Sequence, residues 1–364
     1  MAPLKDELGA SAGRRLAGEL ARAWPDFPVR RFTRGLADAL EPLELLARGE
    51  ALTARLERSL PPNFADAVGV LARALESPTF TGWIVLPCGG FVARAGIDDP
   101  DRALPLLASL TSRWSSEFAV RPFIERHPEK TYEVLATWST HADEHVRRLA
   151  SEGSRPRLPW AAQLRGLVAD PGPNLPLLDT LADDPSPYVR RSVANHLNDI
   201  AKDHPALALE LGERWIGRGD GAAWTVRHGL RTLVKRGDAR ALRLLGASVD
   251  DDVDLIAFEL DRDSIEVGDA VTLSATLSLA RGSGDPVDVV IDYRVHYVGA
   301  RGGAKAPKVF KLARRTLVPG VSSTVTRRHR FEDVSIRRIH PGPHAIDLQV
   351  NGRVLGASSV DVAR

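Results

Sequence analysis

The sequence contains the passage DDPSPYVRRSVANHLNDIAKDHP at residues 183–205, which has the features of a capped helix. Asp183-Asp184-Pro185 predicts a turn and a helix cap, because Asp accepts hydrogen bonds from free helical N–H groups and Pro is tolerated at a helix start. The apolar positions that follow form one stripe at helical spacing: Val189, Val193, Leu197 and Ile200. Such a stripe must be buried against neighbouring helices.

A Val-Arg pair like the one at Val189 recurs along the chain, with further pairs beginning at Val120, Val146 and Val226. The later intervals are close to the length of a helical hairpin of the HEAT type. The surrounding sequence is rich in Ala, Leu and Arg, and its apolar residues follow helical spacing. We therefore predict an all-α HEAT-like repeat solenoid with a concave face over residues 1–248.

The character of the sequence changes at an acidic linker that comprises Asp250, Asp251, Asp252 and Asp254. Beyond it, alternating apolar and polar residues indicate strands, as in VTLSATLSL (271–279) and VDVVIDYRVHYV (287–298). About seven short strands are expected, separated by turns that contain Gly and Pro. This spacing predicts an all-β, antiparallel Ig-like sandwich over residues 252–364, so that the chain is multidomain.

The composition is typical of a soluble globular protein, because 43% of the 364 residues are hydrophobic and 26% are charged. The single cysteine, Cys88, excludes an internal disulfide and a thiolate zinc site. The N-terminus lacks an apolar signal region, and no segment approaches about 18 uninterrupted apolar residues. We therefore expect a cytoplasmic, nucleoid-associated protein without membrane contact. With 49 basic and 47 acidic residues, any basic surface must be local.

Charged residues gather on helix faces opposite the apolar stripes. Three successive helices are predicted to present such residues to one groove: Trp114, Glu117 and Arg121; then Arg148, Glu152 and Arg155; then Arg191, Asn195 and Asn198, with Asp199 beside them. Within each set the residues are three or four positions apart, so their side chains should line up. Alternatively, these are ordinary ion pairs on solvated helix faces, each worth about 0.2 to 0.5 kcal/mol.

The segment SEGSRPRLPW (151–160) is difficult to explain as a solvated helix. Its Gly and Pro residues should end the helix early and leave Arg155, Arg157 and Trp160 on a loop beside Glu152. A tryptophan at this place either closes the core of the hairpin or forms an aromatic platform for a base, a sugar or a cation. The sequence alone leaves both alternatives open.

The helical half contains four long runs that are more specific than a generic HEAT signature: WIVLPCGGFVARAG (83–96), RWSSEFAVRPFIERHPE (113–129), HVRRLASEGSRPRLPWA (145–161) and SPYVRRSVANHLNDIAKDHP (186–205). These runs closely resemble the AlkC branch of the AlkC/AlkD-like DNA alkylation-repair glycosylases. A β-sandwich after the helical repeats is also the layout of one subgroup of that branch. The resemblance covers essentially the whole helical half.

The resemblance implies a bacterial, monofunctional DNA glycosylase of base excision repair that removes positively charged N-alkylated bases, 3-methyladenine and 3-methylcytosine. Its relatives bend DNA along the concave solenoid and act without a deep base pocket. The resemblance implies active-site roles for Glu117, Glu152 and Trp160, with Asp199 as a further acidic member. It also implies DNA contacts for two arginines, Arg148 and Arg155.

Those residue types suit that chemistry. A cationic base departs as a neutral molecule and needs no general acid, whereas the sugar becomes oxocarbenium-like. A fixed carboxylate, Glu152 or Glu117, would stabilise that charge and orient the attacking water. Trp160 would add an attraction to the cation, and Arg148 and Arg155 would hold flanking phosphates.

Further contacts with double-stranded DNA are expected from arginines that share the groove, Arg121, Arg157 and Arg191. The sandwich adds nine basic residues and no acidic residue between positions 301 and 330, and we expect Lys305, Lys308 and Lys311 among them to bind the DNA backbone. Alternatively, these charges only protect solvated edge strands against aggregation.

The sequence predicts no cofactor and no metal. The ten histidines lack ligand spacing, and no phosphate-binding glycine motif is present. The expected partner is double-stranded DNA that contains alkylated bases, bound by a monomer. The principal alternative is a non-catalytic HEAT-type scaffold that binds DNA or protein. A carbohydrate-active enzyme with Glu117 and Glu152 as its carboxylate pair would need a more aromatic cleft.

Overall fold

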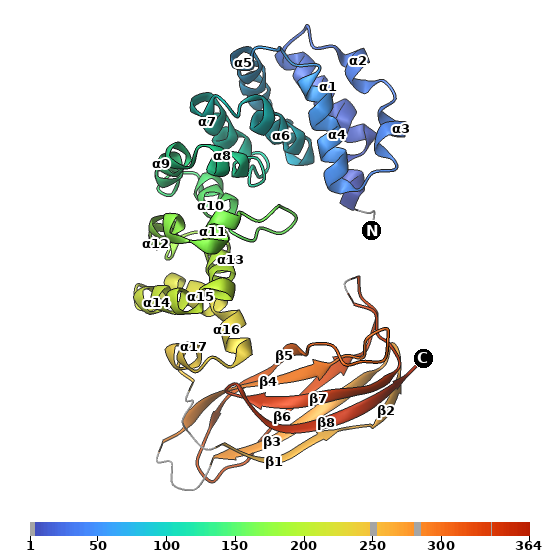
Figure 1. The fold of residues 1–364 in the computed structure, drawn as a ribbon, viewed down its shortest axis with the longest axis vertical. Coiled ribbons are helices and arrows are strands. Elements are labelled where there is room, and N and C mark those ends of the chain that lie inside the picture. The colour runs from blue at the N-terminus through green and yellow to red at the C-terminus, as the bar shows by residue number, and fades with distance from the viewer. Residues whose placement is uncertain (1–3, 248–252, 280–284, 336) are drawn as a thin grey trace. The chain divides into compact units, whose positions relative to one another are not determined.

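The computed structural model describes residues 4–247, 253–279, 285–335 and 337–364, and it divides into two compact units, Met1–Gly229 and Leu230–Arg364 (Figure 1). The linker residues Asp250, Asp251 and Asp252 lie outside the described residues. Among the described residues, no helix is long and apolar enough to span a membrane.

The first unit is entirely helical, and its helices stack in two columns, with α5, α7, α9, α12 and α14 along one side (Figure 1). Its α-helices are α1 (Ala10–Ala23), α2 (Val29–Thr33), α3 (Leu36–Leu40), α4 (Leu45–Glu57), α5 (Phe64–Leu75), α6 (Leu86–Ala95), α7 (Pro100–Thr111), α8 (Arg121–Arg126), α9 (Pro128–Trp138), α10 (Glu144–Gly153), α11 (Arg165–Ala169), α12 (Leu175–Leu181), α13 (Pro187–Asp203), α14 (Pro205–Trp215) and α15 (Asp220–Gly229). Three short 3-10 helices accompany them: η1 (Leu4–Leu8), η2 (Gly82–Val85) and η3 (Gly172–Asn174). The predicted helical solenoid is confirmed.

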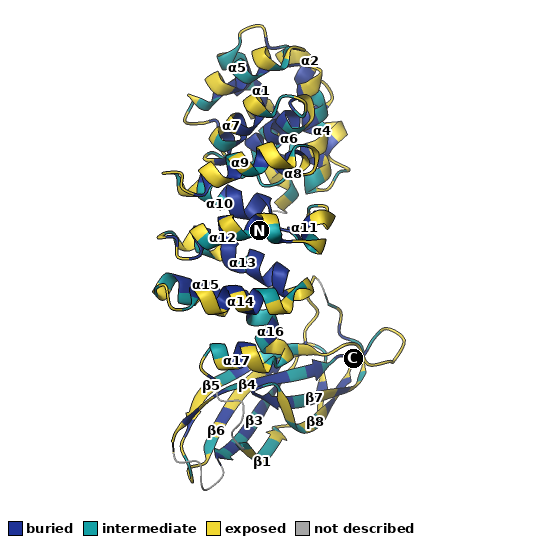
Figure 2. Ribbon diagram, turned by 60° about the vertical axis from the view of Figure 1, so that its left-hand side comes forward, coloured by how far each residue is buried: buried dark blue, intermediate teal, exposed yellow. Residues whose placement is uncertain are grey.

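The helix predicted from the opening passage is α13, and its apolar stripe is fully buried, from Val189 at 0% to Ile200 at 1% exposure. Figure 2 shows this burial as dark blue along α10 and α13. The predicted cap is wrong, because Ser186 caps α13 by accepting a hydrogen bond from Tyr188 N. The two aspartates instead bind neighbouring repeats. Asp184 accepts two hydrogen bonds from Arg147, and Asp183 accepts one from Ala222 N.

The Val-Arg pairs occupy equivalent places in only two helices. Val146 and Val189 both lie in the first turn of a helix, α10 and α13, whereas Val120 precedes α8 and Val226 lies near the end of α15. The repeat is therefore regular in the middle of the unit, which is where the candidate site lies.

The second unit contains α16 (Arg231–Arg236), α17 (Ala239–Leu244) and a two-sheet sandwich, which confirms the predicted fold class. Its described strands are β1 (Val253–Leu260), β2 (Ser264–Glu266), β3 (Ala270–Leu279), β4 (Val287–His296), β5 (Lys308–Leu317), β6 (Ser323–Arg330), β7 (Gly342–Val350) and β8 (Arg353–Ala363). One sheet has the order β1-β3-β6 and the other β2-β8-β7-β4-β5. The pairs are antiparallel as predicted, except that β2 pairs with β8 in parallel.

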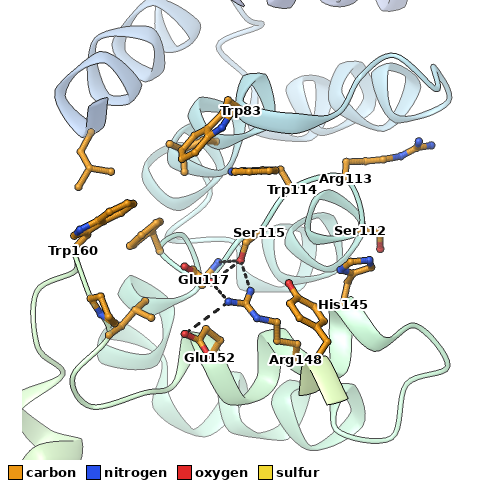
Figure 3. Close-up of a pocket in the computed structure, with 16 residues that line it drawn as sticks. Trp83, Ser112, Arg113, Trp114, Ser115, Glu117, His145, Arg148, Glu152 and Trp160 are labelled. Carbon is orange, nitrogen blue, oxygen red and sulfur yellow. Dashed lines mark hydrogen bonds and ion pairs between the residues drawn. The ribbon is translucent and has the colours of Figure 1, made fainter. Parts of the chain in front are cut away.

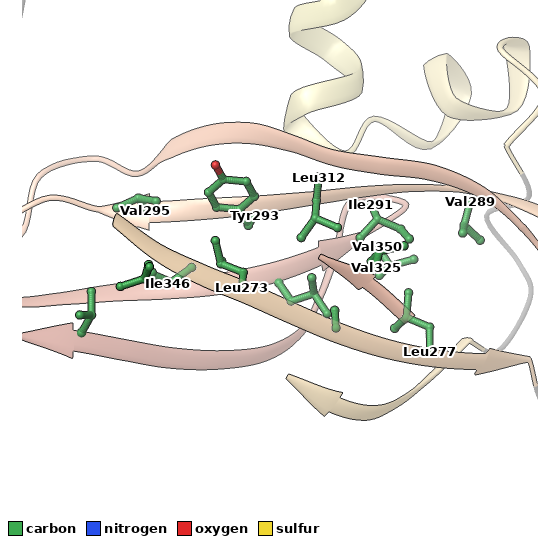
Figure 4. Close-up of a cluster of buried hydrophobic side chains, with 14 of the residues drawn as sticks. Leu273, Leu277, Val289, Ile291, Tyr293, Val295, Leu312, Val325, Ile346 and Val350 are labelled. Atoms are coloured by element: carbon green, nitrogen blue, oxygen red, sulfur yellow. The ribbon is translucent and has the colours of Figure 1, made fainter. Parts of the chain in front are cut away.

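Side chains from both sheets form the core of the sandwich, because alternate residues of each strand point inward. Figure 4 shows Leu273 and Leu277 of β3 with Ile291 of β4 and Ile346 of β7 in this core. The two C-terminal helices pack against the same unit. Gly237, after α16, approaches Gly352 so closely that a Cβ atom on Gly352 would lie 2.3 Å from the Gly237 Cα atom.

Candidate active site

A cavity of about 490 Å³ opens in the middle of the helical unit (Figure 3). Its walls come from α4, η2 and the start of α6, from the segment between α7 and α8, from α10 and the loop after it, and from the start of α13. The residues that carry polar or aromatic groups into these walls include Trp83, Trp114, Ser115, Glu117, His145, Arg148, Glu152, Trp160 and Tyr188. The cavity therefore combines acidic, basic and aromatic groups.

The segment between α7 and α8 forms turns, so the predicted single helix face for Trp114, Glu117 and Arg121 is wrong. Ser116 interrupts the helix because its hydroxyl donates to Leu107 O and its N–H donates to the Thr111 hydroxyl. As a result, Trp114 and Glu117 line the cavity, whereas Arg121 at the start of α8 is buried.

Arg121 fixes the loop that follows α10. Its guanidinium donates to Gly153 O at 3.0 Å, to Arg155 O at 2.8 Å and to Ala162 O at 2.7 Å. Burial lowers the pKa of Arg121 to about 10. Arg121 thus has a structural role in this conformation, and its predicted contact with DNA stays a prediction.

The loop after α10 presents Trp160 at the edge of the cavity, as Figure 3 shows. The early end of α10 at Gly153 confirms the predicted helix break. Trp160 is 65% exposed and has a φ of +66°, a backbone conformation that is costly for residues with a Cβ atom. Its exposure shows that the tryptophan does not close the hairpin core.

Arg148 lies between the two carboxylates of the cavity. Its Nη2 atom is 2.9 Å from Glu117 Oε2 and 3.8 Å from Glu152 Oε1. Although burial alone would lower the pKa of Arg148, the charges of the two glutamates raise it above its usual value. The guanidinium carbon also lies 4.9 Å from the centre of the Tyr188 ring, which adds a cation–π contact.

The two carboxylates differ in how fully they are bound. Glu152 is 6% exposed, and both its oxygens are engaged: Oε1 accepts from Arg155 Nη1 at 2.7 Å and Oε2 from the Ser192 hydroxyl at 2.6 Å. Glu117 accepts from the Ser115 hydroxyl at 2.8 Å. Within the described part of the chain, Ser115 and Arg148 both contact Oε2 of Glu117, and no hydrogen bond or ion pair involves its Oε1 atom.

Asp199 lies behind the cavity and is 1% exposed. Its Oδ2 atom is 2.8 Å from Arg155 Nε and its Oδ1 atom is 2.9 Å from Lys202 Nζ. Burial opposes the charge of Arg155, but Glu152 and Asp199 outweigh it and raise the pKa of this guanidinium. Arg155 is therefore an internal cation between two carboxylates, and its predicted phosphate contact stays a prediction.

The remaining basic residues predicted to bind DNA do not line this cavity. Arg157 forms a bidentate ion pair with Asp203 at 2.7 and 2.8 Å, and Arg191 is exposed on α13. In the other unit, Lys305, Lys308 and Lys311 are all exposed. The last two lie on β5, which is an edge strand of its sheet, as the edge-protection explanation requires. The contact of the three lysines with DNA stays a prediction.

Sequence reasoning missed several residues of the site. Trp83 lies 4.6 Å, centre to centre, from the Trp114 ring and extends the aromatic wall. Ser115 and Ser192 hold the two glutamates, and Tyr188 contacts Arg148. The four runs quoted above contain all four missed residues, but nothing in their spacing distinguishes them from structural residues.

The described residues contain no cluster of three or more ligating side chains that could hold a metal. Cys88 is buried, and burial raises the pKa of its thiol. The polar groups of the cavity are carboxylates, guanidinium groups, hydroxyls and the imidazole of His145. The carboxylates suit a reaction that passes through a cation.

Two proteins resemble this chain over nearly its whole length. The uncharacterized protein YhaZ of Bacillus subtilis (strain 168) is 36% identical over 356 residues, which is 97% of this chain and 98% of that protein. The Pseudomonas fluorescens alkylpurine DNA glycosylase AlkC, in a structure bound to DNA containing an abasic site analog, is 35% identical. The structural match covers 100% of both chains with a TM-score of 0.94.

The sandwich by itself also matches a known family model, described as the C-terminal Ig-like domain of uncharacterised protein YhaZ, over residues 254–364. Since the likeness in sequence and in structure extends over both the helical repeats and the sandwich, the chain belongs to the AlkC branch of the AlkC/AlkD-like family.

Proposed function

We propose that this protein is a DNA glycosylase that removes cationic N-alkylated bases, 3-methyladenine and 3-methylcytosine, from double-stranded DNA. The observation that carries the proposal is the pair of carboxylates, Glu117 and Glu152, on either side of Arg148 in a cavity with three tryptophans. A full-length relative at 35% identity is an alkylpurine DNA glycosylase.

The proposed reaction is hydrolysis of the N-glycosidic bond. When the bond breaks, its electron pair passes to the base, which leaves as a neutral molecule, and the sugar becomes an oxocarbenium-like cation. Water then forms the new bond to the sugar carbon and releases a proton to the solvent. The base needs no general acid, because its positive charge already makes it a good leaving group.

We assign the contact with the sugar to Glu117. Its unengaged Oε1 atom can approach the developing cation and orient the water, whereas both oxygens of Glu152 are already bound by protein groups. Glu152 would supply negative charge from a fixed position, and Asp199 would hold Arg155 in place. Trp160 would contact the cation through the face of its ring.

Binding of DNA would change the partners of Arg148. A DNA phosphate group near the cavity mouth would compete with the two carboxylates for the guanidinium of Arg148. If Arg148 moved towards the phosphate, the negative charge of Glu117 would be less neutralised. We assign Arg121 and Arg155 to holding the site together. The phosphate contacts would come from Arg148, Arg157 and Arg191, and from the lysines of the sandwich. The protein would act as a monomer on cytoplasmic DNA.

The experiment is incubation of the protein with methylated duplex DNA, followed by measurement of free 3-methyladenine, 3-methylcytosine and 7-methylguanine. Glu117→Gln should lower the rate of release by at least tenfold and as much as about a thousandfold, because charge that develops in the transition state loses its partner. Trp160→Ala should lower the rate less. Glu129→Gln, which removes an exposed carboxylate of α9, is the matched control.

Release of the cationic bases by the wild type, with loss in Glu117→Gln and normal DNA binding, would support the proposal. If folded wild-type protein binds DNA but releases no base above the spontaneous rate, the protein is a non-catalytic scaffold.

A further inference from the structure

Five arginines at the N-terminal end of the helical unit form a cluster that the proposed active site does not use. They are Arg30, Arg31, Arg34, Arg55 and Arg58, and we call them the N-terminal arginine cluster. Three of the five line a hollow of about 320 Å³ between α2 and α4, beside Phe32 and Ser59. All are exposed except Arg55, which is half-buried.

Arg55 gives the hollow a fixed wall. Its Nη1 atom donates to Phe32 O at 2.6 Å and to Arg34 O at 3.0 Å, so α4 is tied to the end of α2. Phe32 is 1% exposed and anchors the other side. Because these bonds use only Nη1, the guanidinium is held in place with donors to spare.

The cluster lacks the carboxylates that accompany ten of the other twenty arginines of this unit. Among the described residues, no carboxylate lies within 4.0 Å of any of its five guanidinium groups. Glu57, the nearest acidic residue in sequence, instead lies 3.6 Å from Arg94 on α6. By contrast, carboxylates pair with Arg22, Arg48, Arg94, Arg102, Arg147, Arg148, Arg155, Arg157, Arg214 and Arg218.

A concentrated, unpaired set of guanidinium groups repels itself and gains from an external anion. Arginine forks match the oxygens of a phosphate group, and the hollow offers one fixed and two exposed arginines to such a group. An exposed surface that only needed solubility would mix charges of both signs.

The cluster lies apart from the cavity. Helix α4 carries Leu46, which lines the candidate active site, near one end and is followed by Arg58 at the other. At about 1.5 Å and 100° per residue, the two positions are about 18 Å apart along the helix and about 120° apart around it. A phosphate group bound by the cluster would therefore lie beside the lesion and not at it.

We propose that the N-terminal arginine cluster binds the phosphodiester backbone of duplex DNA to one side of the lesion. This proposal rests on the proposed function, since it takes the lesion to occupy the cavity. The contact adds affinity without base specificity, and it makes one flank of the DNA more important than the other.

The test compares Arg31→Gln/Arg58→Gln with a control, Arg214→Gln/Arg218→Gln, which removes two exposed arginines that pair with Asp179. Fluorescence anisotropy measures the dissociation constant for a long duplex with a central abasic analogue at several salt concentrations. The cluster variant should bind about tenfold more weakly. The salt slope, which is the change in the logarithm of the binding constant with the logarithm of the salt concentration, should fall in magnitude by about 1.8, at about 0.9 per lost phosphate contact. The control slope should change by less than about 0.5, and Arg31→Lys/Arg58→Lys should restore most of the slope.

A second measurement shortens one flank of a hairpin-closed duplex from ten base pairs to four. The wild type should lose affinity when one particular flank is shortened, and the cluster variant should be indifferent to both flanks. Equal slopes in the cluster and control variants, or unchanged flank dependence in the cluster variant, would overturn the proposal. So would saturable binding of inorganic phosphate that the cluster variant loses while its binding to DNA stays normal.

These outcomes are independent of catalysis. If the wild type releases no alkylated base, the proposed function fails, whatever the salt slopes are. If the wild type releases the base but the cluster variant keeps the wild-type slope and flank dependence, only the present inference fails.

Discussion

The buried charges behind the cavity make a strong prediction about stability. Arg155→Met keeps most of the aliphatic part of the side chain but removes the cation between Glu152 and Asp199. Those contacts measure 2.7 and 2.8 Å, and the side chains involved are at most 8% exposed. Removal of one partner from a buried ion pair costs about 3 to 5 kcal/mol, because the remaining charge stays in a poor solvent.

The expected loss in the free energy of unfolding is about 3 kcal/mol, at the lower end of that range, since Lys202 still pairs with Asp199. Typical slopes with urea then place the midpoint of unfolding about 1 M lower, as measured by circular dichroism of the helices. Arg157→Met is the control. Its ion pair with Asp203 is 28% and 24% exposed, so its loss should cost less than about 1 kcal/mol.

The combination of Arg155→Met with Asp199→Asn should recover part of the loss, because a neutral amide replaces the buried carboxylate of Asp199, which would otherwise keep Lys202 as its remaining cation. If Arg155→Met shifts the midpoint no further than the Arg157→Met control, the argument from buried charge is wrong. If the double variant loses as much free energy of unfolding as the two single substitutions added together, the two residues do not interact.

Three further predictions concern other parts of the molecule. His329 lies between the hydroxyls of two tyrosines, and burial lowers its pKa from 6.5 to about 4. The stability of the sandwich should therefore be complete above about pH 6.5 and fall as the pH drops towards 4. His329→Phe should weaken this pH dependence in thermal melts, and an identical pH profile would contradict the prediction. Ser115→Ala should lower the rate of base release by about tenfold with unchanged DNA affinity, because Glu117 loses its positioning hydrogen bond; an equal loss of affinity would point to misfolding instead. Gly352→Ala should destabilise the second unit by at least about 2 kcal/mol in chemical unfolding, since Gly352 has a φ of +84° and touches the backbone of Gly237; wild-type stability would show that the two segments separate freely.

The sequence predicted those features that depend on local pattern. The stripe of α13 was apparent from its spacing, and the Gly and Pro residues after Glu152 correctly placed Trp160 on a loop. The two-sheet sandwich followed from alternation and turn residues. In each case the physical cause lies within about ten consecutive residues.

Features that depend on tertiary contacts could not be predicted in this way. The turn at Ser116 arises because side-chain hydroxyls replace helical hydrogen bonds, a choice that the apolar pattern does not record. Arg121 and Arg148 have the same chemistry in the sequence, yet one binds backbone carbonyls in the interior and the other lies between two cavity glutamates. Only the fold distinguishes these two fates.

The backbone at Trp160 has a consequence for how the protein has evolved. A left-handed backbone costs a tryptophan about 1 kcal/mol or more, and a residue that is 65% exposed recovers little of this by burial. Glycine would relieve the strain, so a chain optimised for folding alone would carry glycine here. At position 160, glycine would increase stability but remove the aromatic surface, and tryptophan does the opposite. A thermostable descendant that kept the tryptophan would need its stabilising substitutions at other positions.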